Sequence, residues 1–561
     1  MKLLMKTLSS LEKVFLDEEP MRVSTAHSAL MNESSAFQIA YTVIPEEGDE
    51  AKYAGSVKLG MEIISPIKEF IRVRRIDHVP IRTSRLSRSD TDYLREGPGM
   101  FPDILRDIPA HGLRGCMKQW DSLWIDIEPE GKAAAGEYPI TVRLWEEKDG
   151  EEEPSNVIEA EYTVTIIGAE LPEQKLYHTK WFHSDCLAVY YNVPVFSEEY
   201  WRIVENFMAA AVKRSINMIL TPIHTPPLDT RVGGERPTVQ LVDIACDGGK
   251  WSFGFEKLDR WVEMAKRVGV KYFEIAHLFT QWGAKYAPKI MATVDGEYKR
   301  VFGWETDGVG EEYTAFLCEY VPAVCERMKM HGVFENCLFH VSDEPHLDHL
   351  EGYMKAKNVL KPLIGDCPII DALSNYEFYT SGAVERPIPA VNHIEPFIEG
   401  NTPHLWSYYC IGQNKDTANV FIGMPAYRNR IYGEQLYKYN IEGILQWGYN
   451  FYYSQGSDYP INPFMDPDWD GHSLAGDTFQ VYPGPKGEPW ESTRMMVSNH
   501  AIQDLRAFKL LESLAGREFV MRLIDGDLPE EEKITFSAYP RRADYILKLR
   551  EKVNAEIAKR V

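Results

Sequence analysis

The sequence lacks the signatures of several common protein classes. Its eight cysteines among 561 residues form no CxxC pair, and Cys337, Cys367 and Cys410 lie in apolar runs that are typical of buried thiols. This usage disfavours a disulfide framework and favours a reducing compartment. No stretch approaches the apolar length that a membrane-spanning helix needs. Polar residues from Ser9 onward interrupt the apolar start too early for a secretory signal, so we expect a cytoplasmic protein.

Positive charge is also scarce. The chain has 61 Lys and Arg residues against 84 Asp and Glu residues, which gives a formal net charge of -23. Binding to phosphate groups or to an anionic membrane needs clustered basic side chains. This balance therefore argues against nucleic acid and membranes as partners, and an uncharged substrate fits better than a polyanion. The oligomeric state stays open.

Motifs for several reaction classes are missing as well. There is no GxSxG nucleophile elbow, no HExxH metal motif and no GxGxxG after the first strand of the α/β region. A zinc or manganese site is the main alternative explanation for the polar residues at the strand ends. Five of them could in principle meet at an ion: His183, Asp185, His224, His277 and His393. The HxD pattern at 183–185 is weak, however, and we expect neither a metal nor a cofactor.

The first 170 residues read as β structure. Apolar and polar residues alternate along 36–43, 138–144 and 160–166, as expected for strands with one buried face. Strands at this spacing predict an antiparallel β-sandwich over residues 1–170. The acidic run 146–153 between two of these strands is predicted to be a solvated hairpin tip.

From about residue 175, strands alternate with helices. Ser197 followed by Glu198 and Glu199 is a typical helix start, and Gly269 and Gly332 are typical helix ends. Eight apolar runs are strand candidates: 176–181, 217–220, 271–276, 337–340, 368–371, 389–392, 404–408 and 443–447. The fold class is therefore α/β, and the pattern predicts a (β/α)8 barrel over residues 171–505, with a doubly wound sheet as the alternative. Residues 506–561 are predicted to form a helical C-terminal extension.

Asp343 and Glu344 are the most informative pair of residues. They follow the apolar run Cys337–Phe339, and Pro345 forces a turn directly after them. The carboxyl ends of barrel strands are where such folds keep their chemistry. The competing interpretation is that Asp343 caps the next helix and Glu344 faces solvent.

Other predicted strands also end in polar or aromatic residues, which are costly to bury without partners. Aromatic faces can stack on sugar rings, although each aromatic residue can equally belong to the barrel wall. We expect ten of these residues to bind substrate: Trp181, His183, Asp185, His224, Trp282, Asn392, Tyr408, Trp447, Tyr449 and Asn450.

Acids beside aromatic walls suit the cleavage of a glycosidic bond. Most glycosidases need two carboxylates on opposite sides of that bond, and Asp185, Asp371 or Glu395 are candidates for the second one. Adjacent acids favour instead a mechanism in which the 2-acetamido oxygen of the sugar attacks its own anomeric carbon. A barrel that binds sugars without cleaving them is a third possibility.

Two motifs resemble glycoside hydrolase family 123 and the wider group of DUF4091 domain proteins. They are His340-Val341-Ser342-Asp343-Glu344-Pro345 and the run from Trp181 to Ala188. Gln446 to Asn450, Tyr482-Pro483-Gly484, Arg494 and Asp504-Leu505-Arg506 are similar to the C-terminal part of that family. The resemblance extends over about residues 170–515.

This resemblance implies a retaining β-N-acetylgalactosaminidase on a (β/α)8 barrel without a metal. It implies that Asp343 orients the acetamido group and that Glu344 acts as the acid and then the base. The implied partner is a small oligosaccharide or a glycoconjugate with a terminal N-acetylhexosamine.

Overall fold

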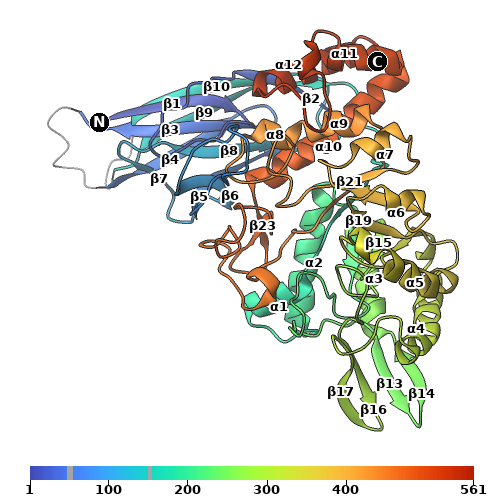
Figure 1. The fold of residues 1–561 in the computed structure, drawn as a ribbon. Coiled ribbons are helices and arrows are strands. Elements are labelled where there is room, and N and C mark those ends of the chain that lie inside the picture. The colour runs from blue at the N-terminus through green and yellow to red at the C-terminus, as the bar shows by residue number, and fades with distance from the viewer. Residues whose placement is uncertain (47–54, 149–153) are drawn as a thin grey trace.

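The computed structural model describes residues 1–46, 55–148 and 154–561. Its N-terminal part consists of two five-stranded sheets (Figure 1). Neighbouring strands are antiparallel except β2 and β10, which run parallel. The first sheet has the order β1 (Lys2–Ser9), β3 (Ser35–Ile44), β8 (Asp121–Ile127), β5 (Ile71–Ile81), β6 (Gly99–Asp107); the second has the order β2 (Ala26–Leu30), β10 (Ser155–Ile167), β9 (Gly136–Glu146), β4 (Ser56–Ile64), β7 (Leu113–Cys116).

Both sheets contribute buried apolar residues to one core, so this region is built as two packed layers. Phe37 of β3 stacks on Tyr162 of β10 across the layers, with ring centroids 3.9 Å apart. The three predicted strands are confirmed as β3, β9 and β10. Of the predicted acidic tip at 146–153, Glu146 is the last residue of β9 and pairs with Ser155, and residues 149–153 lie outside the described residues.

Eight parallel strands follow in the second part of the chain. Six form the sheet β18-β15-β12-β11-β22-β21, and β19 pairs with β20. Parallel bridges between Phe339 and Ile369 and between Ala390 and Tyr408 connect these two groups at both ends, so the pairings form a closed cycle. The strands are β11 (Tyr177–Lys180), β12 (Met218–Thr221), β15 (Tyr272–Ile275), β18 (Cys337–Phe339), β19 (Ile370–Leu373), β20 (Arg386–Pro389), β21 (Trp406–Tyr408) and β22 (Gly443–Gln446).

Seven of these strands overlap the predicted runs closely, and the sixth differs. The sequence predicts it at 389–392, whereas β20 ends at Pro389. The His393 N–H donates to the Ala390 carbonyl oxygen at 2.8 Å and closes a turn there. The apolar residues Ala390 and Val391 continue past the end of the strand because they remain buried, so hydrophobicity alone places the strand too late.

Helices lie between consecutive strands of the cycle. Ser197 caps α2, and its hydroxyl accepts from the Tyr200 N–H at 3.2 Å, as predicted from the sequence. The connecting helices are α1 (Ser184–Tyr191), α2 (Glu198–Lys213), α3 (Glu256–Val268), α4 (Glu311–Met330), α5 (Leu350–Leu360), α6 (Glu377–Thr380), α7 (Glu395–Glu399), α8 (Ala426–Arg430) and α9 (Tyr432–Lys438). The chain is therefore a mixed α/β protein, with antiparallel sheets followed by a parallel sheet with helices.

Two hairpins extend from the loops after β12 and β15. They are β13 (Asp243–Asp247) with β14 (Lys250–Gly254) and β16 (Ile290–Val294) with β17 (Glu297–Phe302), and together they form one four-stranded sheet that projects from the body (Figure 1). A further small hairpin, β23 (Val481–Pro483) with β24 (Pro489–Glu491), precedes the C-terminal helices.

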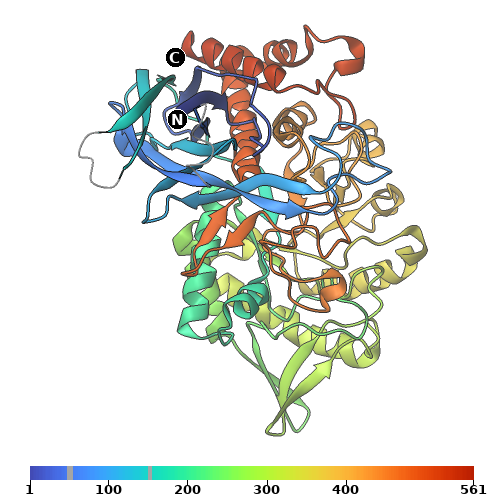
Figure 2. The same ribbon diagram turned by 90° about the vertical axis from the view of Figure 1, so that its left-hand side faces the viewer.

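Three helices complete the chain: α10 (Thr493–Ala515), α11 (Arg517–Asp525) and α12 (Ala543–Ala558). α10 is largely buried, and both α10 and α12 lie beside the N-terminal sheets (Figure 2). The predicted start of the helical extension at residue 506 falls inside α10, which is continuous across that position. Within the described ranges, no helix combines the length and apolar character needed to span a bilayer.

Candidate active site

A cavity of about 580 Å³ opens at the carboxyl ends of the parallel strands. Asp343 and Glu344 line it, and so do four of the ten residues predicted to bind substrate: Trp181, Trp282, Tyr408 and Trp447. Trp181 follows β11, Tyr408 ends β21 and Trp447 follows β22. The closed cycle thus brings to one place residues that are far apart in the sequence.

The backbone at Glu344 is held in an unusual conformation. Its φ of 41° lies in the left-handed region, which costs a residue other than glycine about 1–3 kcal/mol. Two hydrogen bonds fix it: the Glu344 N–H donates to the Ala372 carbonyl oxygen at 3.1 Å, and the Trp282 N–H donates to the Asp343 carbonyl oxygen at 2.8 Å. Backbone strain of this kind clusters at functional sites. His346 rather than Asp343 caps the short helix that follows, so the helix-cap interpretation of Asp343 is wrong.

The two acids share the cavity but differ in their surroundings. Glu344 is half-buried, and its Oε1 accepts a hydrogen bond from the Tyr408 hydroxyl at 2.6 Å. Burial raises the pKa of Asp343 well above its ordinary value of 3.8, and the neighbouring Glu344 carboxylate adds to that rise. The pair therefore carries one negative charge more readily than two.

A buried network supports the floor of the cavity. His340 contacts Glu274 through Nε2 at 2.6 Å and Asp371 through Nδ1 at 2.8 Å. Burial disfavours a charge on His340, but its hydrogen bonds to Asp371 and Glu274 raise its pKa to about 9. The Trp181 indole N–H donates to the same Glu274 at 2.7 Å. This network fixes the wall at Trp181 and the strand that leads to Asp343.

The other six predicted substrate residues lie outside the lining of this cavity as the described residues define it. Asp185 accepts from Arg236 at 2.6 Å, and the Nδ1 of His183 lies 3.1 Å from the same guanidinium. Burial lowers the pKa of His183 to about 3, and the charge of Arg236 acts in the same direction. Asn450 bonds to both the backbone N–H and the carbonyl oxygen of His183. These three residues hold the start of α1 against the loop after β22.

The remaining three also make contacts with the protein itself. The His224 Nε2 lies 2.8 Å from the His277 carbonyl oxygen, and the Tyr449 hydroxyl donates to the Phe207 carbonyl oxygen at 2.8 Å. Asn392 is exposed and accepts from the Gln413 side chain at 2.8 Å.

The candidates for metal binding and for an opposed carboxylate are similarly dispersed. The Arg236 guanidinium contacts both His183 and Asp185, where a cation would have to bind, and His393 is exposed in the turn after β20. Asp371 belongs to the His340 network, and Glu395 begins α7. His277, His340 and Asp371 each bring one ligand atom within 4.8 Å of the others, but both nitrogens of His340 already contact carboxylates.

Sequence reasoning missed Asp229, which lines the same cavity from the loop after β12. Its φ is 52°, and its Oδ2 has no hydrogen-bond partner among the residues the structure describes. Burial raises the pKa of Asp229 to about 7; Arg236 opposes that rise and Glu344 adds to it. Asp229 lies well beyond the end of its strand, so a search of strand ends could not find it. Trp469 also lines the cavity and was missed for the same reason, whereas Gln281, which precedes the predicted Trp282, lines it without having been proposed as a substrate residue.

Comparisons with known proteins identify the family of the chain and its fold. The family model described as "Glycoside hydrolase 123, catalytic domain" matches residues 181–511. Among solved structures, a family 123 glycoside hydrolase from Clostridium perfringens, described in connection with glycolipid glycan hydrolysis, is 14% identical and aligns with a TM-score of 0.73 over 100% of this chain and 98% of its own. That similarity shows the same fold.

A GH10 xylanase from Thermobacillus composti aligns over 53% of this chain and 94% of its own at 14% identity, with a TM-score of only 0.29. A search of curated protein sequences finds no match. Because the family model covers more than half of the chain, the protein belongs to glycoside hydrolase family 123.

Proposed function

We propose that the protein is a retaining β-N-acetylgalactosaminidase in which the substrate supplies its own nucleophile. The observation that carries this proposal is the common cavity of Asp343 and Glu344. Adjacent residues at a strand end diverge, so one carboxyl can face the acetamido group while the other faces the leaving oxygen. The closed cycle of parallel strand pairings supports a (β/α)8 barrel as the scaffold, with the β-sandwich before it and the helical extension after it.

In the first step, Asp343 accepts a hydrogen bond from the acetamido N–H, and the acetamido oxygen attacks the anomeric carbon. In the substrate complex Asp343 is the carboxylate and Glu344 holds the one proton of the pair, and the bond to the leaving oxygen breaks as Glu344 transfers that proton to the leaving oxygen. The Tyr408 hydroxyl holds Glu344 at the cavity wall during this transfer. In the second step, Glu344 removes a proton from water, which attacks the anomeric carbon and reopens the bicyclic intermediate. Two inversions at one carbon give overall retention.

The aromatic side chains of the cavity wall suit contact with the ring of a terminal sugar. Trp181, Trp447 and Trp469 are available to contact the ring, and Trp282 at the mouth is 50% exposed. We propose that the substrate is a small oligosaccharide or a glycoconjugate with a terminal N-acetylhexosamine. The Clostridium perfringens enzyme is described as hydrolysing glycolipid glycans, and these are one class of substrate to test here.

The variants Asp343→Asn and Glu344→Gln test the mechanism on an aryl β-N-acetylgalactosaminide. Each is expected to lose about 100- to 10,000-fold in kcat/KM, the usual range for a positioned proton donor or orienting acid. Glu351→Gln is the matched control, because that acid is exposed on α5 and pairs with Lys355 on the same helix. Substantial activity in both active-site variants would reject the assignment.

A screen of aryl glycosides that differ only at C2 and C4 tests the sugar. Cleavage of the 2-acetamido compounds, together with inhibition by a thiazoline mimic of the intermediate, is the expected result. Cleavage of 2-hydroxy sugars instead would favour an opposed-carboxylate mechanism, for which Asp229 and Asp458 are additional acids that line the cavity.

A further inference from the structure

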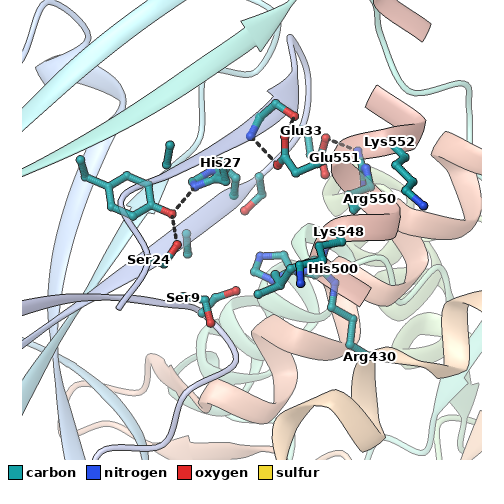
Figure 3. A pocket seen from close by; sticks show the side chains of 18 of the residues that line it. Ser9, Ser24, His27, Glu33, Arg430, His500, Lys548, Arg550, Glu551 and Lys552 are labelled. Carbon is teal, nitrogen blue, oxygen red and sulfur yellow. Dashed lines mark hydrogen bonds and ion pairs between the residues drawn. The ribbon is translucent and has the colours of Figure 1, made fainter. Parts of the chain in front are cut away.

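A second cavity, of about 520 Å³, lies between the N-terminal sheets and the C-terminal helices (Figure 3). His27 on β2 and His500 on α10 both line it, and Arg550 on α12 and Arg430 on α8 complete one side. None of the residues that line it also lines the cavity around Asp343. Segments that are remote in the sequence therefore enclose a space that the proposed reaction does not use.

The charged groups of this cavity are already paired. Arg550 donates to Glu33 at 2.6 Å and to Asp504 at 2.7 Å, and Arg430 donates to the same Asp504 at 2.7 Å. The charges at the rim are matched in the same way: Lys548 with Asp544, Lys552 with Asp527, and Glu551 with the backbone N–H and hydroxyl of Ser28. A charged ligand would have to compete with these pairs.

Several uncharged polar groups of the cavity, by contrast, lack hydrogen-bond partners among the described residues. Within the described ranges, both ring nitrogens of His500, the Nε2 of His27 and the hydroxyl of Ser35 are buried and have no hydrogen-bond partner. The other nitrogen of His27 lies 3.1 Å from the Tyr162 hydroxyl. Unpartnered buried polar atoms are costly, so such a group signals a missing hydrogen-bond partner.

Both imidazoles are neutral. Burial lowers the pKa of His27 to about 3 and that of His500 well below its ordinary value, and the nearby arginines act in the same direction. A neutral imidazole carries one donor and one acceptor. Hydroxyl groups also donate and accept, whereas a carboxylate or phosphate only accepts. Neutral imidazoles beside arginines that already pair with carboxylates are therefore matched to an uncharged compound with several hydroxyls.

We propose that this cavity binds a small uncharged polyhydroxyl compound, either a sugar ring or a linear polyol. Its volume lies in the range of small-molecule sites, and Ala36 and Leu547 supply apolar surface for the C–H faces of such a ligand. The site is separate from Asp343 and Glu344 and does not depend on the function proposed for them.

Equilibrium binding to the full-length chain tests the proposal, with galactose, glycerol and inorganic phosphate as separate probes in calorimetric titrations. The variant Ala555→Trp places an indole in the cavity from an exposed position on α12. Ala558→Trp is the matched control, since it is exposed on the same helix and does not line the cavity. Equal melting temperatures of the two variants show that both are folded.

We expect galactose or glycerol to bind the wild type and Ala558→Trp alike and to bind Ala555→Trp at least about 10-fold more weakly, while cleavage of aryl glycosides stays unchanged. His27→Ala removes one unpartnered nitrogen and should weaken binding roughly 3- to 10-fold. Preference for galactose over glycerol identifies a sugar, and the reverse identifies a polyol. Equal binding to both tryptophan variants, no binding of either neutral probe, or binding of phosphate alone would overturn the proposal.

Discussion

Asp477 is a fully buried acid beside the candidate active site. Its Oδ2 accepts a hydrogen bond from the indole N–H of Trp447, which lines the cavity, at 3.1 Å. Burial raises the pKa of Asp477 from 3.8 to about 7, although the bond from Trp447 opposes that rise. The folded protein therefore keeps a proton on Asp477 at pH values where the unfolded chain has released it.

This shift makes stability depend on pH in a defined direction. The stabilisation from protonated Asp477 is fully present below about pH 4 and is lost as the pH rises to 7. Asparagine has the shape of the protonated acid and does not titrate. We therefore expect Asp477→Asn to raise the free energy of unfolding at pH 8 by on the order of 2–4 kcal/mol and to change it little at pH 4.

Urea denaturation at pH 4 and pH 8 measures this difference. Asp348→Asn serves as the control, because Asp348 is exposed in the short helix that follows Asp343 and Glu344. A gain of the same size at both pH values would mean that the titration of Asp477 is not its source.

At the scale of single elements, the contact between β21 and β22 depends on one glycine. Gly443 is the register partner of Trp406, whose side chain is fully buried. A Cβ added at Gly443 would overlap the Trp406 indole ring. Strand β22 can approach β21 only because this residue has no side chain.

The variant Gly443→Ala should therefore destabilise the closed cycle of strands. We expect a loss of about 1–3 kcal/mol in the free energy of unfolding, the usual cost of overpacking a core. Gly412→Ala is the control, since nothing lies within 4 Å of a Cβ at that exposed position. Equal melting temperatures for the two variants would contradict this account.

The elements also show which parts of the structure were accessible from the sequence. Parallel strands are buried on both faces and so appear as short apolar runs, which is why seven of the eight were located. The end of β20 was misplaced because Ala390 and Val391 stay buried in the turn that follows. The carboxyl ends of these strands meet at one cavity. The positions of Trp181 and Tyr408 at strand ends therefore identified both as cavity residues.

Contacts between distant residues could not be predicted in this way. Tyr449 follows the same strand as Trp447, and only the packed structure decides which of them faces the cavity. Asp185 looked available for a substrate because its partner Arg236 lies in a separate loop. Asp229 reaches the cavity through a loop conformation that no local pattern marks.

At the scale of the whole molecule, buried ion pairs join the β-sandwich to the parallel-strand region. Glu491 at the end of β24 accepts from Arg74 of β5 at 2.6 Å and from Arg214 after α2 at 3.1 Å. Burial alone would raise the pKa of Glu491, but the charges of Arg214 and Arg74 lower it to about 2. The two regions should therefore unfold together.

Removing the charge of Glu491 leaves two buried arginines without that partner. We expect Glu491→Gln to lower the free energy of unfolding by about 3–5 kcal/mol at pH 7. This loss should shrink as the pH falls from 4.5 towards 2, because the wild-type Glu491 then becomes protonated and loses the stabilising charge itself. Glu530→Gln, at an exposed pair with Lys533, is the control in differential scanning calorimetry. Two separate transitions in the wild type would contradict the coupling.

The left-handed backbone at residue 344 has a practical consequence for enzymology. Glycine adopts this conformation without strain, so Glu344→Gly should fold at least as well as the wild type while it lacks the acid. The loss of the Glu344 side chain leaves room beside the Tyr408 hydroxyl for a small external anion. Added formate or azide should then restore turnover of an activated aryl substrate in proportion to its concentration, and the same anions should have no such effect on Glu351→Gly.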